Sequence, residues 1–191
     1  MLLLAIAPGV ERRLFSCCYC CERFMTSQPA QLRSTTPADL DFVLPAEAAA
    51  HAAGCVRLWT RDRHLQTLAD PNEGHWIVAD TTTGDRVGYV ILLGLQDPDQ
   101  CILLKRIVIT QTGKGYGRSV LMQVLEKAFG EFAAHRVWLD VMEDNHRARS
   151  LYRSLGFVEE GRLRESVKLD DQFESMWLMS MLRSEFKARS A

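Results

Sequence analysis

The feature that most constrains this 191-residue chain is a turn with alternate glycines between a strand and a helix. An apolar run ending at Ile109 predicts a buried strand, and apolar residues at helical spacing after Gly117 predict a helix. Gly113, Gly115 and Gly117 tolerate left-handed backbone and leave the N–H groups of the turn uncovered. With the positive end of the helix dipole, these groups form a site for an anion such as a pyrophosphate.

Two other phosphate-binding motifs fit this turn less well. A Walker loop requires Ser or Thr after Gly-Lys, but Gly113-Lys114 is followed by Gly115. A dinucleotide-binding fold places its glycines in the first strand–helix unit of a parallel sheet, whereas this turn follows several strand-like runs in mid-chain. Glycines that only allow close strand–helix packing are the remaining alternative. Lys114 and Arg118 can add charge-assisted contacts to outer phosphates.

The order of hydrophobic patterns predicts strand, helices, three strands, helix, strand, helix and two strands. The three central runs are separated by turn sequences and therefore indicate an antiparallel meander. A first strand at Gln31–Thr35 and a last hairpin of Phe157–Leu169 and Phe173–Leu182 complete a single α/β domain over residues 31–184, followed by a C-terminal tail at 185–191. The central strands are expected at His75–Ala79, Arg86–Leu95 and Cys101–Ile109, and the next at Arg136–Val141.

The first helical region begins at a recognisable cap. Thr36 supplies a capping hydroxyl and Pro37 stands at the first helical position. An Ala-rich stretch then continues to about Leu68, and Pro45 and Gly54 are expected to interrupt it.

A second amphipathic helix opens at Asn145. Its apolar positions fall at i, i+3, i+4 and i+7, and Gly156 supplies the stop; these positions are Ala148, Leu151, Tyr152 and Leu155. Two simple interpretations stay open on the residues alone. Asn145 is explained by helix capping, and Tyr152 by a half-buried ring whose hydroxyl reaches the surface.

Charge and hydropathy exclude several classes of partner. A net charge of −1 gives no general reason to bind nucleic acid or an anionic membrane. No apolar run approaches the roughly 20 residues that a spanning helix needs. The sequence therefore predicts no nucleic-acid and no membrane partner.

Residues 1–30 do not match the rest of the chain. We interpret them as a disordered leader, or as translated upstream sequence with the working start at Met25. Residues 17–21 hold four of the six cysteines, but a zinc site needs a second, separated ligand pair, so we predict no metal. Cys55 and Cys101 lie in apolar contexts and are predicted to be reduced core residues of a cytoplasmic protein.

The glycine turn is followed by the pattern Asn-x-x-Ala-x-x-Leu-Tyr-x-x-x-Gly-Phe, from Asn145 to Phe157. This pair of motifs resembles the GCN5-related N-acetyltransferase (GNAT) family, and the resemblance extends over about Leu32–Leu182. Either motif alone is unspecific, but the two in this order are specific. The lead-in Lys105–Ile109, the segment 139–145 and the last hairpin are most similar to the ribosomal-protein and polyamine acetyltransferase branch.

The resemblance implies a mixed, mostly antiparallel sheet of about six to seven strands flanked by helices. The sheet would splay between the strand ending near Ile109 and the one ending near Val141. Acetyl-CoA would be the cosubstrate, with its pantetheine arm in the gap and its pyrophosphate on the turn. Tyr152 would protonate the departing thiolate. The residues implied to hold the cosubstrate are Val108, Ile109, Gly113, Lys114, Gly115, Tyr116, Gly117, Arg118 and Asn145.

The chain departs from the family pattern at two positions. Thr112 stands where the turn of most relatives begins with Arg or Gln. Leu103 stands where many relatives carry a Glu that serves as a base through water, so the sequence identifies no catalytic base. Because the attacking amine must be neutral, the missing base favours an α-amine, with a pKa of about 7.7–8.0, over a Lys side chain at about 10.4.

The predicted acceptor is thus a primary amine: a protein N-terminus, a polyamine or another small amine. Four carboxylates could form an acidic lip that recruits a cation, although solvated loop residues are the simpler explanation; they are Glu143, Asp144, Asp97 and Asp99. A non-catalytic acyl-CoA sensor is the alternative from another functional class. An exposed edge in the last hairpin suggests a homodimer.

Overall fold

The computed structural model describes residues 28–169 and 171–190. Its strands are β1 (Ala30–Ser34), β2 (Glu73–Asp80), β3 (Arg86–Leu93), β4 (Cys101–Ile109), β5 (Arg136–Met142), β6 (Val158–Leu169) and β7 (Gln172–Leu182). Its helices are α1 (Leu40–Ala52), α2 (Arg61–Ala69), α3 (Tyr116–Glu126), α4 (His146–Ser154) and α5 (Arg183–Ser190). A 3₁₀ turn at Pro37–Asp39 precedes α1, and a π-helical turn at Lys127–Glu131 follows α3.

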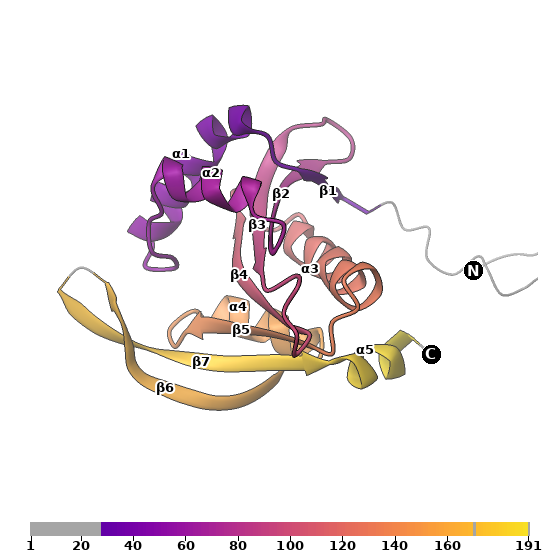
Figure 1. Ribbon diagram of the computed structural model, residues 1–191. Coiled ribbons are helices and arrows are strands. Elements are labelled where there is room, and N and C mark those ends of the chain that lie inside the picture. The colour runs from indigo at the N-terminus through magenta and orange to yellow at the C-terminus, as the bar shows by residue number, and fades with distance from the viewer. Residues whose placement is uncertain (1–27, 170, 191) are drawn as a thin grey trace, which may run out of the picture.

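The strands form one sheet in the order β1-β2-β3-β4-β5-β7-β6. Every neighbouring pair is antiparallel except β4 and β5, which are parallel. Helices α1 and α2 cover one face of β2–β4, and α3 covers the other (Figure 1). The predicted mixed, mostly antiparallel α/β sheet is confirmed.

The sheet separates two apolar cores. On the α3 face, Val120, Leu121, Val124 and Leu125 are fully enclosed, as their helical spacing predicts. On the other face a smaller core joins Leu40 and Val43 of α1 to the buried side chains of β2–β4. Strands β2 and β3 are covered on both faces, so their residues are buried in succession rather than alternately.

Strands β4 and β5 part soon after they meet. Their pairing covers only Cys101–Leu103 and Arg136–Trp138 in the described sheet. On its other side β4 carries a bulge, since Leu104 pairs with Leu92 and Arg106 with Ile91, leaving Lys105 as the extra residue. Bulges bend and twist a strand, and this one lies where β4 turns away from β5. In Figure 1 the β5–β7–β6 group runs in a different direction from β2–β4. The predicted splay is confirmed.

The first helical region differs from prediction at Pro45. The capping box at Thr36 with Pro37 forms as expected, but α1 continues through Pro45 to Ala52. Packing of buried α1 side chains against the sheet outweighs the hydrogen bond that the proline removes. Gly54, with φ +70°, then ends this stretch, and α2 begins afresh at a Thr60 cap.

The prediction of buried cysteines is wrong. Cys55 is exposed in the connection between α1 and α2, and Cys101 is partly exposed at the start of β4. Apolar neighbours in sequence did not imply burial: Cys55 follows the left-handed Gly54 and belongs to the connection before α2, not to a helix packed on the sheet. The cysteines at 17–21 and Met25 lie outside the described residues. In the part of the chain described, no group of three or more His, Cys, Asp or Glu side chains could hold a metal ion.

The two ends of the described chain add details to the predicted boundaries. Strand β1 begins at Ala30, one residue inside the predicted leader, and Ala30 is fully buried. Helix α5 occupies most of the predicted tail, and its Phe186 stacks on Phe129 with ring centroids 5.1 Å apart. No helix among residues 28–169 and 171–190 is both long and apolar enough to cross a bilayer. Strand β6 forms an edge of the sheet, as the predicted homodimer requires. The homodimer itself stays a prediction.

Candidate active site

The glycine turn has the backbone conformation that its sequence predicts at two of its three glycines. Gly113 has φ +86° and Gly115 has φ +79°, and Gly115 is the left-handed N-cap of α3. Gly117 instead lies inside α3 without a positive φ. A Cβ there would meet Leu151 Cδ2 of α4 at 3.3 Å, so this glycine serves close packing of α4 on α3.

The turn presents free backbone donors at the start of α3. The first hydrogen bond of the helix runs from the N–H of Ser119 to the carbonyl of Gly115, at 3.2 Å. The N–H groups of residues 116–118 precede it and have no acceptor within the helix. Residues 111–115 are exposed, so an anion can reach these donors and the positive end of the dipole.

The predicted side chains of the turn divide into two groups. Lys114 and Arg118 are exposed; Lys114 Nζ donates to Gln111 Oε1 at 2.9 Å, and Arg118 Nη2 to Ser154 Oγ at 2.5 Å. Both cations are placed to approach outer phosphates. Tyr116 differs, because its ring is buried in the α3 core and its hydroxyl donates to Asp80. Only the backbone of Tyr116 is available to a ligand.

The end of β4 borders the splay, and its backbone alternates in direction. The N–H of Thr110 donates to the carbonyl of Val87 at 2.9 Å, so Thr110 and Val108 direct their backbone groups to β3. The alternate residues Ile107 and Ile109 direct theirs to the open side. Sequence reasoning selected Val108 and Ile109; in this alternation the backbone groups of Ile109 lie on the open side, whereas those of Val108 pair with β3 and its side chain is buried.

Asn145 is the N-cap of α4, as the capping interpretation of this residue predicted. Its Oδ1 accepts the N–H of Ala148 at 3.1 Å. Its amide nitrogen points to Cys55 Sγ at 3.8 Å, a weak contact that a better acceptor would replace. Capping fixes the orientation of the side chain, and therefore of the amide donor, at the end of β5.

Tyr152 is largely buried, with 7% of its surface exposed. Its ring packs edge-on against Phe157 with centroids 5.7 Å apart. Burial, helped by the negative charge of Asp140, raises the pKa of its hydroxyl well above the ordinary value. The phenol therefore keeps its proton at neutral pH, which a proton donor requires.

A pocket of about 310 Å³ lies at the end of β5, between the α1–α2 connection and the tip of the β6–β7 hairpin. Three carboxylates line it, and none of its described lining residues is basic; they are Glu143, Asp144 and Glu174. Arg162 pairs with Glu143 at 2.6 Å and lowers the pKa of that carboxyl.

The predicted acidic lip is therefore correct in part. Asp97 and Asp99 lie in the turn before β4, where the carbonyl of Gln100 accepts the N–H groups of His135 and Arg136. That turn is beside the start of β5, whereas the pocket is at its end. A sequence does not reveal at which end of a later strand an earlier loop will lie.

Sequence reasoning missed a buried polar cluster under α1 and α2, which we call the Glu47 cluster. It comprises Glu47, Trp59, His64, His75, Tyr89 and Arg106. Glu47 is 1% exposed and Arg106 is 5% exposed. The available signal was a lone acid in the Ala-rich stretch of α1 and a lone arginine in the apolar run of β4. Leu103, which stands at the expected base position, is the last residue of β4 paired with β5.

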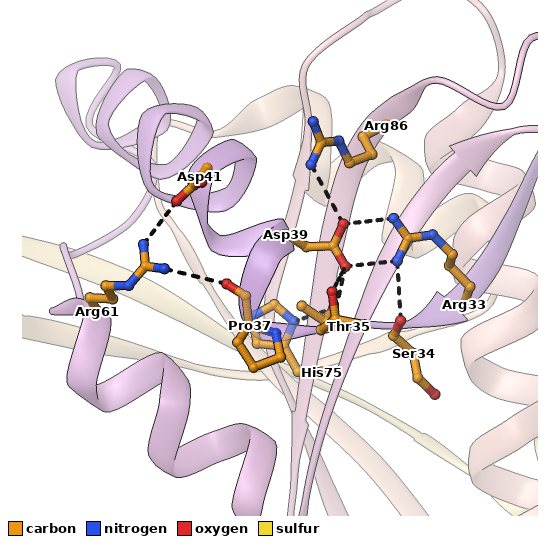
Figure 2. Close-up of polar contacts among 10 residues, drawn as sticks. Arg33, Ser34, Thr35, Pro37, Asp39, Asp41, Arg61, His75 and Arg86 are labelled. Atoms are coloured by element: carbon orange, nitrogen blue, oxygen red, sulfur yellow. Dashed lines mark hydrogen bonds and ion pairs between the residues drawn. The ribbon is translucent and has the colours of Figure 1, made fainter.

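A second polar cluster surrounds Asp39 beside β1 (Figure 2), and Thr35 connects it to His75 of the Glu47 cluster at 2.9 Å. Arg33 makes a two-pronged ion pair with Asp39 at 2.7 and 2.8 Å, and Arg86 Nη1 approaches the same carboxylate at 3.5 Å. Arg33 holds the pKa of Asp39 well below its usual range. This cluster joins β1, β3 and the 3₁₀ turn and touches neither the glycine turn nor the pocket.

Comparison with known proteins decides the family. Residues 40–157 match the acetyltransferase (GNAT) family, and this segment contains both motifs. The chain belongs to the GNAT family. The family resemblance of the two motifs is thus confirmed, together with the fold that it implied.

Of two curated relatives compared with this chain, one is a polyamine acetyltransferase, in agreement with the predicted branch, and the other is an uncharacterized N-acetyltransferase. The chain is 33% identical over 78 residues to the spermidine N(1)-acetyltransferase of Vibrio cholerae, covering 41% of this chain and 45% of that protein. It is 31% identical over 75 residues to an SPbeta prophage-derived N-acetyltransferase of Bacillus subtilis, covering 39% and 42%. These alignments span less than half the length of either relative.

Solved structures give the same fold. Mutant forms of the spermidine/spermine N-acetyltransferase from Vibrio cholerae superpose with a TM-score of 0.75 at 24% identity, covering 85% of this chain and 99% of that one. The Vibrio cholerae enzyme in complex with CoA and spermine gives 0.75 at 23% identity, covering 83% and 98%.

Proposed function

We propose that this chain transfers an acetyl group from acetyl-CoA to a primary amine of a polyamine, with both substrates bound together. One observation carries the proposal. The opening between β4 and β5 has an anion-binding turn on one side and a carboxylate-lined pocket at the end of β5. An anionic cosubstrate and a cationic acceptor can therefore meet in the opening.

The cosubstrate fits the backbone groups around the opening. The pyrophosphate accepts hydrogen bonds from the N–H groups at the start of α3, with Lys114 and Arg118 beside it. The pantetheine arm lies along the free edge of β4, where Ile107 and Ile109 offer backbone donors and acceptors. Asn145 donates its side-chain amide to the same arm.

The reaction needs a neutral amine and a proton for the leaving thiolate. The amine nitrogen attacks the thioester carbonyl, and a backbone N–H of β4 stabilises the developing oxyanion. The C–S bond then breaks and Tyr152 donates its proton to the thiolate. The amine releases one proton to water, and the tyrosinate takes one proton back from water, which restores the enzyme. Orientation of the two bound substrates supplies much of the rate. Because its raised pKa makes Tyr152 a weak acid, its contribution should lie near the lower end of the usual range.

The acceptor is proposed from the charge of the pocket. Carboxylates at Glu143, Asp144 and Glu174 attract the ammonium groups of a polyamine, while one terminal amine reaches the thioester. The named activity of the Vibrio cholerae relative supports the same class of acceptor. A peptide α-amine, which the missing base at Leu103 favoured, is the competing acceptor.

Thiol release from acetyl-CoA distinguishes the two acceptors. We expect kcat/KM for spermidine to exceed that for a peptide with a free N-terminus by at least about tenfold, or ~1.4 kcal/mol of transition-state stabilisation. Added salt should narrow the difference because it screens the carboxylates. A higher kcat/KM for the peptide than for spermidine would contradict the proposal that a polyamine is the acceptor. Binding of acetyl-CoA without thiol release for any amine would identify the protein as a sensor.

A further inference from the structure

We propose that Glu47 is a positioning residue for the transfer: through Arg106 and Tyr89 it fixes the free half of β4 against which the thioester lies. This inference rests on the function proposed above. It concerns a residue of α1 that is too deeply buried to touch either substrate.

Glu47 connects every element around the open half of β4. Its Oε2 forms an ion pair with Arg106 Nη1 of β4 at 2.5 Å and accepts the hydroxyl of Tyr89 of β3 at 2.7 Å. His64 Nε2 of α2 lies 3.1 Å from the same oxygen. Its Oε1 accepts the N–H of Trp59, just before α2, at 2.5 Å. One carboxylate thus joins α1, α2, β3 and β4.

Arg106 stands at the bend of β4. It follows the bulged residue Lys105 directly, and from Leu104 onward β4 has left its partner β5. The next three residues, 107–109, include both backbone edges that face the opening. This half of β4 is paired on one side only, by β3, so its position depends on what its side chains contact.

The side chain of Arg106 contacts α1 and the α1–α2 connection. Besides Glu47, its Nη2 donates to the carbonyl of Arg57 at 2.7 Å, and its guanidinium lies 4.6 Å from the ring centre of Trp59. A planar guanidinium bound on several sides fixes direction as well as distance. Tyr89, the other partner of Glu47, pairs directly with Val108 across β3 and β4. Glu47 therefore fixes the position of β4 through two contacts, directly through Arg106 and indirectly through Tyr89 of the neighbouring strand β3.

Stability alone does not explain this arrangement. A buried ion pair is weak evidence for stability, because apolar side chains of similar volume often hold such layers as well. Apolar contacts, however, do not specify where along β4 the layer sits. Catalysis does require that position, since a displacement of about 1 Å can cost about 10²-fold in rate.

The test compares Glu47→Gln with Asp39→Asn. Both changes remove the charge of a buried carboxylate that pairs with arginine, but the polar contacts of Asp39 are with β1, β3 and Thr36 rather than with β4. Each variant is assayed below its own melting transition for kcat, KM for acetyl-CoA and KM for spermidine. Hydrogen exchange is measured in parallel on peptides covering residues 104–110.

Glu47→Gln should lower kcat by about 10²-fold and change both KM values much less, because misplacement affects the transition state most. Exchange at residues 104–110 should rise in this variant. Asp39→Asn should lose melting temperature but keep kcat and the exchange of β4. Equal loss of kcat in the two variants, or unchanged exchange at residues 104–110 in Glu47→Gln, would overturn the inference.

Tyr89→Phe covers the case in which Glu47→Gln does not fold. It removes one hydrogen bond to Glu47 while the ring keeps its stacking on His75. We expect faster exchange at residues 104–110 and a smaller loss of kcat in the same direction; wild-type exchange and kcat would contradict the role. If wild-type protein releases no thiol with any amine, the proposed function fails, and exchange at β4 still decides whether Glu47 positions the strand.

Discussion

The proposed cosubstrate site and the Glu47 cluster are built from different kinds of contact. The proposed pyrophosphate site uses backbone groups of six consecutive residues, Gly113–Arg118. The Glu47 cluster depends on side chains distant in sequence: Tyr89 reaches Glu47 across 42 positions, and Arg106 reaches the Arg57 carbonyl across 49. A backbone site can be recognised from a short sequence motif, whereas a side-chain network of distant residues can be recognised only in the folded structure.

The largest effect should come from breaking the local site. Gly115→Val places a β-branched residue at φ +79° and covers the donors of α3, so acetyl-CoA affinity should fall by at least about 10²-fold in calorimetry. Gly84→Val is the matched control, because Gly84 has φ +75° and open space around it but lies in the β2–β3 turn. Equal acetyl-CoA affinity in the Gly115 variant and the control would show that the pyrophosphate does not bind at this turn.

The next largest effect should come from the leaving-group proton. Tyr152→Phe keeps the ring that packs on Phe157, so acetyl-CoA affinity should barely change. The value of kcat should fall by about 10²-fold, near the lower limit for a positioned general acid. Steady-state kinetics with spermidine measure this. An unchanged kcat, with chemistry limiting turnover, would make Tyr152 a core aromatic only.

A smaller effect should follow from moving β4 through its neighbour β3. A Cβ at Gly88 would lie 2.3 Å from the carbonyl oxygen of Val108, so Gly88→Ala must shift one strand. We expect a loss of about 1–3 kcal/mol in the free energy of unfolding. The kcat should fall about tenfold, since a shift below 1 Å costs less than 10²-fold. Gly161→Ala is the control, because a Cβ at Gly161 would meet open space. Equal kcat in the two variants would show that the rate does not depend on the position of β4.

The last prediction concerns the pH dependence of stability that His75 of the Glu47 cluster causes, which has little effect at neutral pH. Burial, with the nearby charge of His64, lowers the pKa of His75 from 6.5 to about 3. Between these values the unfolded state binds a proton that the folded state does not, so stability rises with pH. From pH 7 to pH 5 this group should remove about 2 kcal/mol from the free energy of unfolding. Urea unfolding of wild type and His75→Gln at both pH values measures this; equal losses would contradict it.

Much of the fold could be predicted because its signals are local. The alternating runs gave the strands, the capping box at Thr36 gave the start of α1, and the glycine turn and Asn145 gave the starts of α3 and α4. The failures share a cause in tertiary structure. Pro45 is carried inside α1 by packing, and Cys55 is exposed because the chain turns away from the sheet.

The Glu47 cluster was least predictable. A single acid in α1 and a single arginine in β4 look like exceptions to an apolar pattern until the fold brings them within 2.5 Å. The assignment of Val108 also depends on tertiary structure: which residues face the opening follows from the direction of β4 backbone groups, and the Lys105 bulge resets that alternation.

The most direct test of the account is the reaction of the wild-type protein with acetyl-CoA and spermidine. Free CoA, measured by thiol titration, and acetylated spermidine, measured by mass spectrometry, should appear in equal amounts and at the same rate. Saturable binding of acetyl-CoA, with neither product formed from spermidine, spermine or a peptide N-terminus, would contradict acetyl transfer and leave a protein that binds the cosubstrate without using it.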